Sequence, residues 1–349
     1  MISIEVDGKS AEVPEGCSVK EALEILGFEI TMFPSTEALF MPCQTGGCGS
    51  CALDIDGQLT PACISKVHQG MKIKTDASSL TPRRVVGGFM AHKVGGVGTP
   101  WWIKSEGGFI EVACFTSGCN FCCPQCQNWR FAYLNPGDPL TPGEAARLMT
   151  ATKRRYGVSR IAVSGGECTL NRPWLVQYLR LLKEQNPESH LHVDTNGSIL
   201  TKDYLEDLIQ VGMTDLGLDL KAIRASTFQE ITGLVDEELA LKYMETAWQA
   251  ARYLHDTHPE VFLGIGIPYN QELIGIDEIR AMGEKIAEID PWIQVSALDY
   301  RPEFRRPDLV KPSFWDMMQV HAVLRDCGLE SVICQTERGK IGPTGRLLI

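Results

Sequence analysis

The sequence predicts an α/β protein in which a small β-rich domain precedes a larger domain built on a parallel sheet. Short alternating strand patterns and Asp-Gly turns occupy residues 1–80. Glycine and proline become frequent over residues 81–108, and from residue 109 to 349 short apolar runs alternate with amphipathic helical segments. A chain of 349 residues is long enough for two such domains.

The first 80 residues have the element order of a small β-grasp domain. Apolar and polar residues alternate over 2–6, and the turn at Asp7-Gly8 leads into a second alternating run, which predicts a hairpin. Ser18 and Glu21 form a capping box at the start of a short helix. Strand, strand and helix therefore precede the first group of cysteines.

Four cysteines in this domain are close enough in sequence to hold one inorganic centre. They are Cys43, Cys48, Cys51 and Cys63. The first three have the spacing of plant-type [2Fe–2S] sites, and the glycines between them let the backbone wrap close to sulfide. Tetrahedral zinc is the alternative, but zinc ribbons usually bring two Cys-x-x-Cys pairs and this group has one. The stretch resembles the [2Fe–2S] domains of plant-type ferredoxins and, more closely, of the iron–sulfur subunit of succinate dehydrogenase.

A glycine- and proline-rich stretch at residues 81–108 follows this domain. It contains Pro82, Pro100 and two Gly-Gly pairs. Because this composition is typical of loops, we expect an inter-domain linker here.

Residues 109–349 alternate predicted strands with predicted helices. Strands are predicted at residues 110–115, 160–164, 191–194, 214–220, 261–267 and 292–298. Helices are expected after Thr141, Asn171 and Thr201, over 236–255 and 276–289, and finally over 312–328. This alternation indicates a parallel α/β structure. Parallel α/β folds place active sites at the carboxyl ends of their strands, where Glu167, Asp194 and Asp219 lie in this sequence, although such acids often merely cap the next helix.

A second group of cysteines follows the first of these strands. Cys119, Cys123 and Cys126 are separated by three and then two residues, so one loop can direct three thiolates at a common point. Soft thiolates at this spacing select zinc, copper or an iron–sulfur cluster. Three ligands leave one iron of a four-iron cluster unclaimed by protein, and a small molecule can bind there. The ungrouped cysteines, which include Cys122, Cys168, Cys327 and Cys334, are expected to be small buried hydrophobes.

The second domain resembles the radical S-adenosylmethionine (SAM) superfamily, and in particular the branch of glycyl-radical-enzyme activating enzymes typified by pyruvate formate-lyase activating enzyme. The Cys-x3-Cys-x2-Cys spacing and the Gly-Gly-Glu after the next strand are the motifs that match. The resemblance implies a partial (β/α)6 barrel in which Cys119, Cys123 and Cys126 ligate a catalytic [4Fe–4S] cluster.

The same resemblance implies which residues bind SAM and a cation. SAM is expected to contact Ser164, Gly165, Gly166, Glu167, Asp194, Asn196 and Lys221. In the activating branch, residues that match Asp194, Thr195 and Asp219 help to bind a monovalent cation beside the SAM carboxylate, and we expect the same of them here.

Two positions depart from the family pattern. Gln125 precedes the third cysteine, where the family commonly has an aromatic residue that helps to hold adenine. We therefore expect adenine to be contacted from elsewhere, with Phe121 and Trp129 as candidates. Cys168 follows the Gly-Gly-Glu segment at a position where proline is usual.

The implied activity is that of an oxidoreductase that cleaves SAM with one electron and abstracts hydrogen from a substrate. Our first hypothesis for the substrate is a partner glycyl radical enzyme, and the second is direct chemistry on a small molecule or another macromolecule. The N-terminal [2Fe–2S] cluster would relay electrons from a reduced ferredoxin or flavodoxin. A third hypothesis, a non-catalytic electron-transfer protein, leaves the Gly-Gly-Glu segment without a purpose.

The composition limits the other partners. Lys and Arg total 33 against 44 Asp and Glu, and the resulting net charge of -11 disfavours a nucleic-acid partner. No apolar run approaches the roughly 20 residues that span a bilayer. The first residues also lack the features of a signal peptide, so we expect a cytoplasmic protein without a membrane partner.

Overall fold

The computed structural model describes residues 1–104 and 108–348. Its first part is a five-stranded sheet with the strand order β2-β1-β7-β5-β6. The elements are β1 (Ile2–Val6), β2 (Lys9–Val13), α1 (Val19–Ile25), β5 (Ala52–Ile55), β6 (Gln58–Pro61) and β7 (Lys72–Lys74). The short strands β3 (Ile30–Thr31) and β4 (Leu39–Phe40) pair with each other beside it. This arrangement confirms the small ferredoxin-like domain.

Local sequence signals explain why this domain folds as predicted. The β1–β2 hairpin turns at Asp7 and Gly8, which both have positive φ as a tight hairpin turn requires. Helix α1 begins at Ser18, whose side chain accepts from the Glu21 amide while the Glu21 carboxylate accepts from the Ser18 amide. The buried side chains of α1 and of the sheet then form one apolar cluster.

The strands of the second domain form a ten-stranded sheet within the described residues. Its order is β10 (Asp138–Leu140), β8 (Arg84–His92), β9 (Glu111–Thr116), β11 (Arg160–Gly165), β12 (His190–Thr195), β13 (Asp215–Asp219), β14 (Phe262–Tyr269), β15 (Gln294–Asp299), β16 (Val332–Thr336) and β17 (Gly339–Ile341). The strands from β9 to β16 in this order are parallel, and β8, β10 and β17 are antiparallel additions. The six predicted strands are confirmed as β9 and β11 to β15, and β16 extends them, giving a partial barrel.

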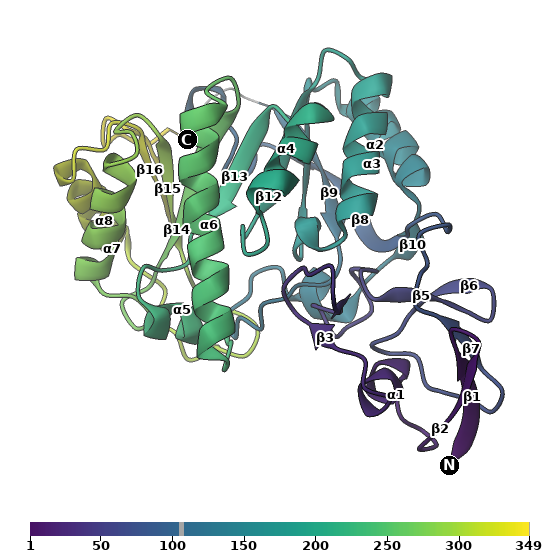
Figure 1. Ribbon diagram of the computed structural model, residues 1–349. Helices are drawn as coiled ribbons and strands as arrows, with labels where there is room; N and C mark the ends of the chain where they lie inside the picture. Colours follow the sequence, from purple (N-terminus) through teal and green to yellow (C-terminus); the bar gives the residue numbers. More distant parts are fainter. Residues whose placement is uncertain (105–107, 349) are drawn as a thin grey trace.

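The helices lie outside the sheet and pack against it (Figure 1). They are α2 (Pro142–Tyr156), α3 (Arg172–Gln185), α4 (Lys202–Gln210), α5 (Ala225–Thr232), α6 (Glu237–Thr257), α7 (Ile276–Ala287) and α8 (Phe314–Asp326). Short helical turns occur at η1 (Trp101–Ile103), η2 (Arg130–Leu134) and η3 (Cys168–Leu170). Their apolar faces and the sheet share one large core. None of the described helices has the length and apolar character needed to cross a membrane.

The prediction of an inter-domain linker at residues 81–108 is wrong for most of that stretch. Arg84–His92 forms β8, which pairs with β9 inside the main sheet. The glycine-rich segment that follows lies directly against the neighbouring strands: a Cβ on Gly98 would come within 2.5 Å of the backbone nitrogen of Gly217 in β13. Glycine is therefore frequent here because backbone meets backbone, a reason that composition cannot distinguish from loop flexibility. Residues 105–107 lie outside the described part of the chain.

Candidate active site

A cavity of about 520 Å³ opens at the carboxyl ends of the parallel strands. Its lining includes every residue of the second domain that the sequence predicted for cluster, SAM or cation binding. These are Cys119, Cys123, Cys126, Ser164, Gly165, Gly166, Glu167, Asp194, Thr195, Asn196, Asp219 and Lys221. The volume is in the range of sites that enclose a small cofactor. Residues from four different strand ends are therefore brought to one place.

The cysteine loop leaves β9 at Ser117 and returns through the π-helical turn η2. Burial raises the pKa of the Cys123 thiol to about 12, and it raises the pKa of Cys119 and Cys126 as well. Such buried thiols become thiolates when metal binds them, because a coordinating metal stabilises the anion. Three adjacent thiols facing one cavity thus fit the ligand set of a [4Fe–4S] cluster with one open iron.

Glu167 lies at the end of the β11 segment, and its side chain is 1% exposed. Its carboxylate accepts hydrogen bonds from the Thr195 hydroxyl at 2.6 Å and from the Asn196 amide at 2.7 Å. It also accepts from the hydroxyl of Thr169 at 2.6 Å and from the Thr169 amide at 3.0 Å. Both carboxylate oxygens of Glu167 therefore already have partners within the protein, and the side chain fixes the loop after β12. The Gly165-Gly166 segment before it lines the cavity with its backbone.

The other predicted acids each face a cation of the protein. Asp219 accepts from the Lys221 ammonium at 3.1 Å, and that ammonium also donates to the Tyr300 hydroxyl at 2.9 Å. Asp194 lies 3.4 Å from a ring nitrogen of His192 and accepts from the Ser164 hydroxyl at 3.4 Å. Burial raises the pKa of Asp219, and the positive charge of Lys221 opposes that rise.

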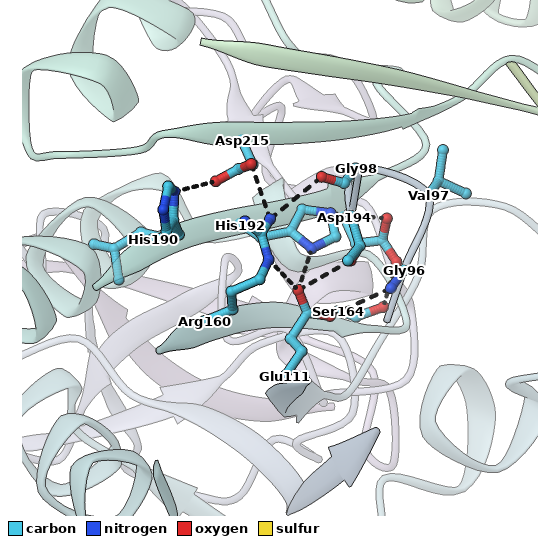
Figure 2. Close-up of polar contacts among 12 residues, drawn as sticks. Gly96, Val97, Gly98, Glu111, Arg160, Ser164, His190, His192, Asp194 and Asp215 are labelled. Carbon is cyan, nitrogen blue, oxygen red and sulfur yellow. Dashed lines mark hydrogen bonds and ion pairs between the residues drawn. The ribbon is translucent and has the colours of Figure 1, made fainter. Parts of the chain in front are cut away.

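A buried ionic network below these acids was not predicted from the sequence (Figure 2). His192 contacts Glu111 at 3.0 Å through its second ring nitrogen, and Arg160 reaches Asp215 at 2.8 Å. Burial raises the pKa of Glu111, but the charge and hydrogen bond of His192 outweigh it and bring that pKa to about 2. His192 lies in the buried middle of β12, two positions before Asp194, where the sequence gives no local sign of its partner.

The positions that depart from the family pattern have distinct surroundings. Gln125 is buried and donates to the Ile231 carbonyl at 2.8 Å, while its amide oxygen has no partner among the described residues. Phe121 is buried and lines the cavity, whereas Trp129 is not part of the lining and stacks on Phe304. Of the two candidates for the adenine contact, only Phe121 is therefore in place.

The cysteines predicted to have no ligand role lie off the cavity lining. The expectation that Cys122 is buried is wrong, because its side chain is exposed and only its backbone amide is engaged, donating to the Thr232 carbonyl at 2.7 Å. Cys168 is buried, and its thiol lies 3.3 Å from the Asp194 carbonyl. Cys327 is partly exposed at the end of α8, and Cys334 is buried in β16.

The four cysteines of the small domain are also brought together. Cys43, Cys48 and Cys51 are buried and Cys63 is partly buried. Hydrogen bonds from the thiols of Cys48 and Cys63 lower the pKa of Cys43, and a hydrogen bond from Cys63 lowers that of Cys51. The four thiols therefore form one connected group, in which Cys43 neighbours Cys48 and Cys63 and Cys63 neighbours Cys51, and four cysteines are the donor set of a [2Fe–2S] cluster.

This group lies at the boundary between the two domains. Cys43 and Cys48 pack with the core of the large domain, and Cys51 packs with the core of the small one. Asn171, at the start of α3, donates to the Cys48 carbonyl at 3.0 Å. Gly118 of the cysteine loop is so close that a Cβ on it would lie 2.7 Å from the Cys48 nitrogen. The residue before Cys119 thus touches the loop that holds the first group.

Comparisons with known proteins match the two parts of the chain separately. Residues 114–274 match the model of the radical SAM superfamily, and residues 1–78 match that of the 2Fe-2S iron-sulfur cluster binding domain. A GTP 3',8-cyclase of Synechococcus elongatus is 32% identical over 140 residues, which are 38% of this chain and 40% of that protein. NADP-reducing hydrogenase subunit HndD of Solidesulfovibrio fructosivorans is 32% identical over 91 residues, 25% of this chain and 16% of that protein. The chain thus spans less than half the length of these curated relatives.

A solved structure shares the fold of the large domain. The FeFe-hydrogenase maturase HydG from Carboxydothermus hydrogenoformans superposes with a TM-score of 0.50 at 16% identity, covering 65% of this chain and 53% of that chain. At this identity the similarity shows the fold alone. The two family matches show that the chain joins a radical SAM domain to a [2Fe–2S] ferredoxin-like domain.

Proposed function

We propose that this enzyme binds a [4Fe–4S] cluster through Cys119, Cys123 and Cys126 and binds SAM in the adjoining cavity. The observation that carries the proposal is that one cavity collects the three cysteines and every predicted SAM contact. When bound, the reduced cluster supplies one electron that splits SAM into methionine and a 5'-deoxyadenosyl radical, which takes hydrogen from the substrate.

The residues of the chain position these groups. The Gly165-Gly166 backbone and the Asp194 and Asn196 loop line the cavity, and Glu167 holds that loop through Thr195 and Asn196. Lys221 brings a buried positive charge to the same space. We propose that these groups bind the amino and carboxylate ends of SAM, and that burial of the cavity keeps water away from the radical.

The N-terminal cluster is proposed to relay electrons to this site. The close approach of Gly118 to Cys48 supports the relay, since the backbones of the two cysteine loops lie against each other there. The electron would come from a reduced ferredoxin or flavodoxin of the cytoplasm and pass from the [2Fe–2S] cluster to the [4Fe–4S] cluster.

The variant Cys43→Ala tests the relay. Anaerobically purified wild-type protein should cleave SAM to 5'-deoxyadenosine with either dithionite or reduced flavodoxin as donor. In C43A we expect one component of the iron absorption spectrum to disappear, cleavage with dithionite to persist and cleavage with flavodoxin to fall. Equal flavodoxin-driven cleavage in both proteins would contradict the relay, and zinc in place of iron would contradict the [2Fe–2S] assignment. A wild-type protein with a full cluster that does not cleave SAM would overturn the enzyme proposal itself.

Two candidates for the hydrogen donor follow. The first is a partner glycyl radical enzyme, supported by Asp194-Thr195-Asn196-Gly197 and Asp219-Leu220-Lys221, which match two segments of the activating branch. It predicts a glycine-centred radical signal in that partner after incubation with SAM and reductant.

The second candidate is direct chemistry on a small molecule. It is favoured by the part of the cavity lining that lies outside the predicted SAM contacts, where Lys104 follows η1 and Lys340 lies on β17. The absence of a glycyl radical in every partner tested, together with substrate-dependent consumption of SAM, would select this candidate.

A further inference from the structure

One part of the cavity lining comes from segments that the proposed SAM site does not use. These are the loop before and after η1, strand β15 and the β16–β17 hairpin. Their polar side chains in the lining are Lys104, Ser296, Gln335, Thr336 and Lys340. Hydroxyl, amide and ammonium groups are all hydrogen-bond donors, and no carboxylate comes from these segments.

Lys340 is the first of the two cations in this region. It lies on β17 directly opposite Gln335 of β16, so both side chains leave the same face of the hairpin toward the cavity. The described residues provide its ammonium with no hydrogen bond and no ion pair. Burial lowers the pKa of Lys340 to about 8, as expected for a desolvated ammonium without a counter-ion.

Lys104 is the second cation, and it is only 1% exposed. Its ammonium donates to the carbonyls of Val94 at 2.9 Å and Gly96 at 2.7 Å. Burial lowers its pKa well below the usual range, and the charge of Lys340 is the next largest cause. The buried ammonium group of Lys104 and the half-buried one of Lys340 therefore both face this cavity.

The acids near these lysines already have other cations. Glu111 contacts His192 at 3.0 Å, and Asp194 lies 3.4 Å from the other ring nitrogen of the same histidine. Asp219 accepts from Lys221 at 3.1 Å. Their charges reach the two lysines only at longer range, so the lysines have no carboxylate of their own. The two ammonium groups in this part of the lining thus form no ion pair with the described residues, and an anion that enters the cavity would meet both of them.

We propose that Lys340, assisted by Lys104, binds an oxyanion of the substrate, a carboxylate or a phosphate, within the active-site cavity. Gln335 and Thr336 lie on the same hairpin and supply neutral donors beside the ammonium. The inference rests on the proposed function, because it takes the cavity as the place where the substrate meets SAM. It adds that the substrate from which hydrogen is abstracted carries an anionic group.

Binding of simple oxyanions to the complete, cluster-loaded enzyme tests the proposal. The probes are inorganic phosphate and acetate, titrated calorimetrically into anaerobic protein saturated with SAM, at constant ionic strength and pH 7. Wild-type protein should bind at least one of them, and the better probe identifies the anion class. K340M should bind it about tenfold more weakly, since a charge-assisted hydrogen bond is lost, and K340R should retain most of the affinity.

Lys285 supplies the matched control. It is also partly buried, with its ammonium 4.3 Å from the ring centre of Trp248, but it lies outside the cavity. K285M should bind the anion as wild-type protein does. The thermal midpoint and SAM affinity of each variant show whether it is folded with an intact SAM site.

These measurements distinguish failure of the oxyanion site from failure of the proposed function. No binding of either probe by wild-type protein, or equal binding by K340M, overturns the oxyanion site. Binding that SAM itself displaces, or loss of SAM affinity in folded K340M, also overturns it, because the lysine would then bind the carboxylate of SAM. Failure of the wild-type protein to bind or cleave SAM would instead refute the proposed function, whatever the anion titration shows.

Discussion

Thr195 donates its hydroxyl hydrogen to the Glu167 carboxylate at 2.6 Å, which joins the end of β12 to the end of β11. The neighbouring Asn196 amide donates to the other carboxylate oxygen at 2.7 Å. Two segments 28 residues apart are thereby fixed at one edge of the cavity. The acid of the Gly-Gly-Glu segment thus binds the protein's own loop, whereas the family resemblance implied that Glu167 contacts SAM.

The variant Glu167→Gln tests this positioning role. A glutamine keeps the size of the side chain but brings an amide group against donors, so one of the bonds to Thr195 or Asn196 must be lost. We expect SAM to bind about tenfold more weakly, and the free energy of unfolding to fall by about 2 kcal/mol. Equilibrium SAM binding and denaturant unfolding measure both effects. Iron content should stay unchanged, and unaltered SAM affinity in E167Q would contradict the role.

Much of this site was predictable because its residues follow strands in the sequence. Cys119, Glu167, Asp194 and Asp219 each come just after a recognisable apolar run, and parallel strands bring those positions to one edge. His192 was missed because it lies inside a strand, where a polar residue gives no local sign of its partner.

The sequence also failed to indicate the role of Lys340 and the path of the backbone over residues 84–104, for two different reasons. The course of residues 84–104 depends on the pairing of β8 with β9, whereas Lys340 lies on the three-residue strand β17, which is too short to show an alternating pattern. The alternating pattern in β8 is interrupted by glycines and a register shift after Val86, so composition suggested a loop. Long-range backbone contacts of this kind leave no periodic signal.

The second prediction concerns Asn171, whose side chain makes two separate hydrogen bonds. Its amide oxygen accepts from the Trp174 amide at 3.2 Å and caps α3, and its amide nitrogen donates to the Cys48 carbonyl at 3.0 Å. N171A should lose both, about 2 kcal/mol of stability in total. N171S keeps a capping oxygen and loses only the bonds to the Cys48 and Arg83 carbonyls, without adding a buried charge, so it should lose about half as much.

Denaturant unfolding of the cluster-loaded protein compares the two Asn171 variants. Wild-type stability in N171S would mean that the bond to Cys48 contributes nothing to the contact between domains. Equal losses in N171S and N171A would assign the whole effect to that bond and none to the helix cap.

His192 makes stability depend on pH in the alkaline range. Burial alone would lower its pKa, but the charge of Glu111 and the contacts with Asp194 raise it to about 10. Because the folded-state pKa exceeds the unfolded value of about 6.5, the stabilisation is complete below pH 6.5 and disappears as pH rises through 10. Wild-type stability should therefore decline over this interval.

The variant His192→Gln should remove that dependence. It cannot carry a charge, so Glu111 loses its buried partner, and we expect a loss of about 3 kcal/mol near neutral pH with a flatter profile above it. Exposed His68 gives the control, because H68Q should follow the wild-type curve. A wild-type slope between pH 7 and 10 that persists unchanged in H192Q would show that another group titrates there.

Asp219 has one carboxylate oxygen that is engaged and one that is not. The first accepts from Lys221 at 3.1 Å, and the second is buried without a hydrogen-bond partner among the described residues. We propose that a monovalent cation beside Asp194 and Thr195 occupies this second oxygen when SAM binds. SAM affinity measured in sodium or potassium chloride should then fall several-fold in tetramethylammonium chloride, whose cation is too large to enter. D219N should show weak binding that no longer responds to the salt. If wild-type protein binds SAM equally in all three salts, Lys221 alone balances Asp219 and the cation has no part in the site.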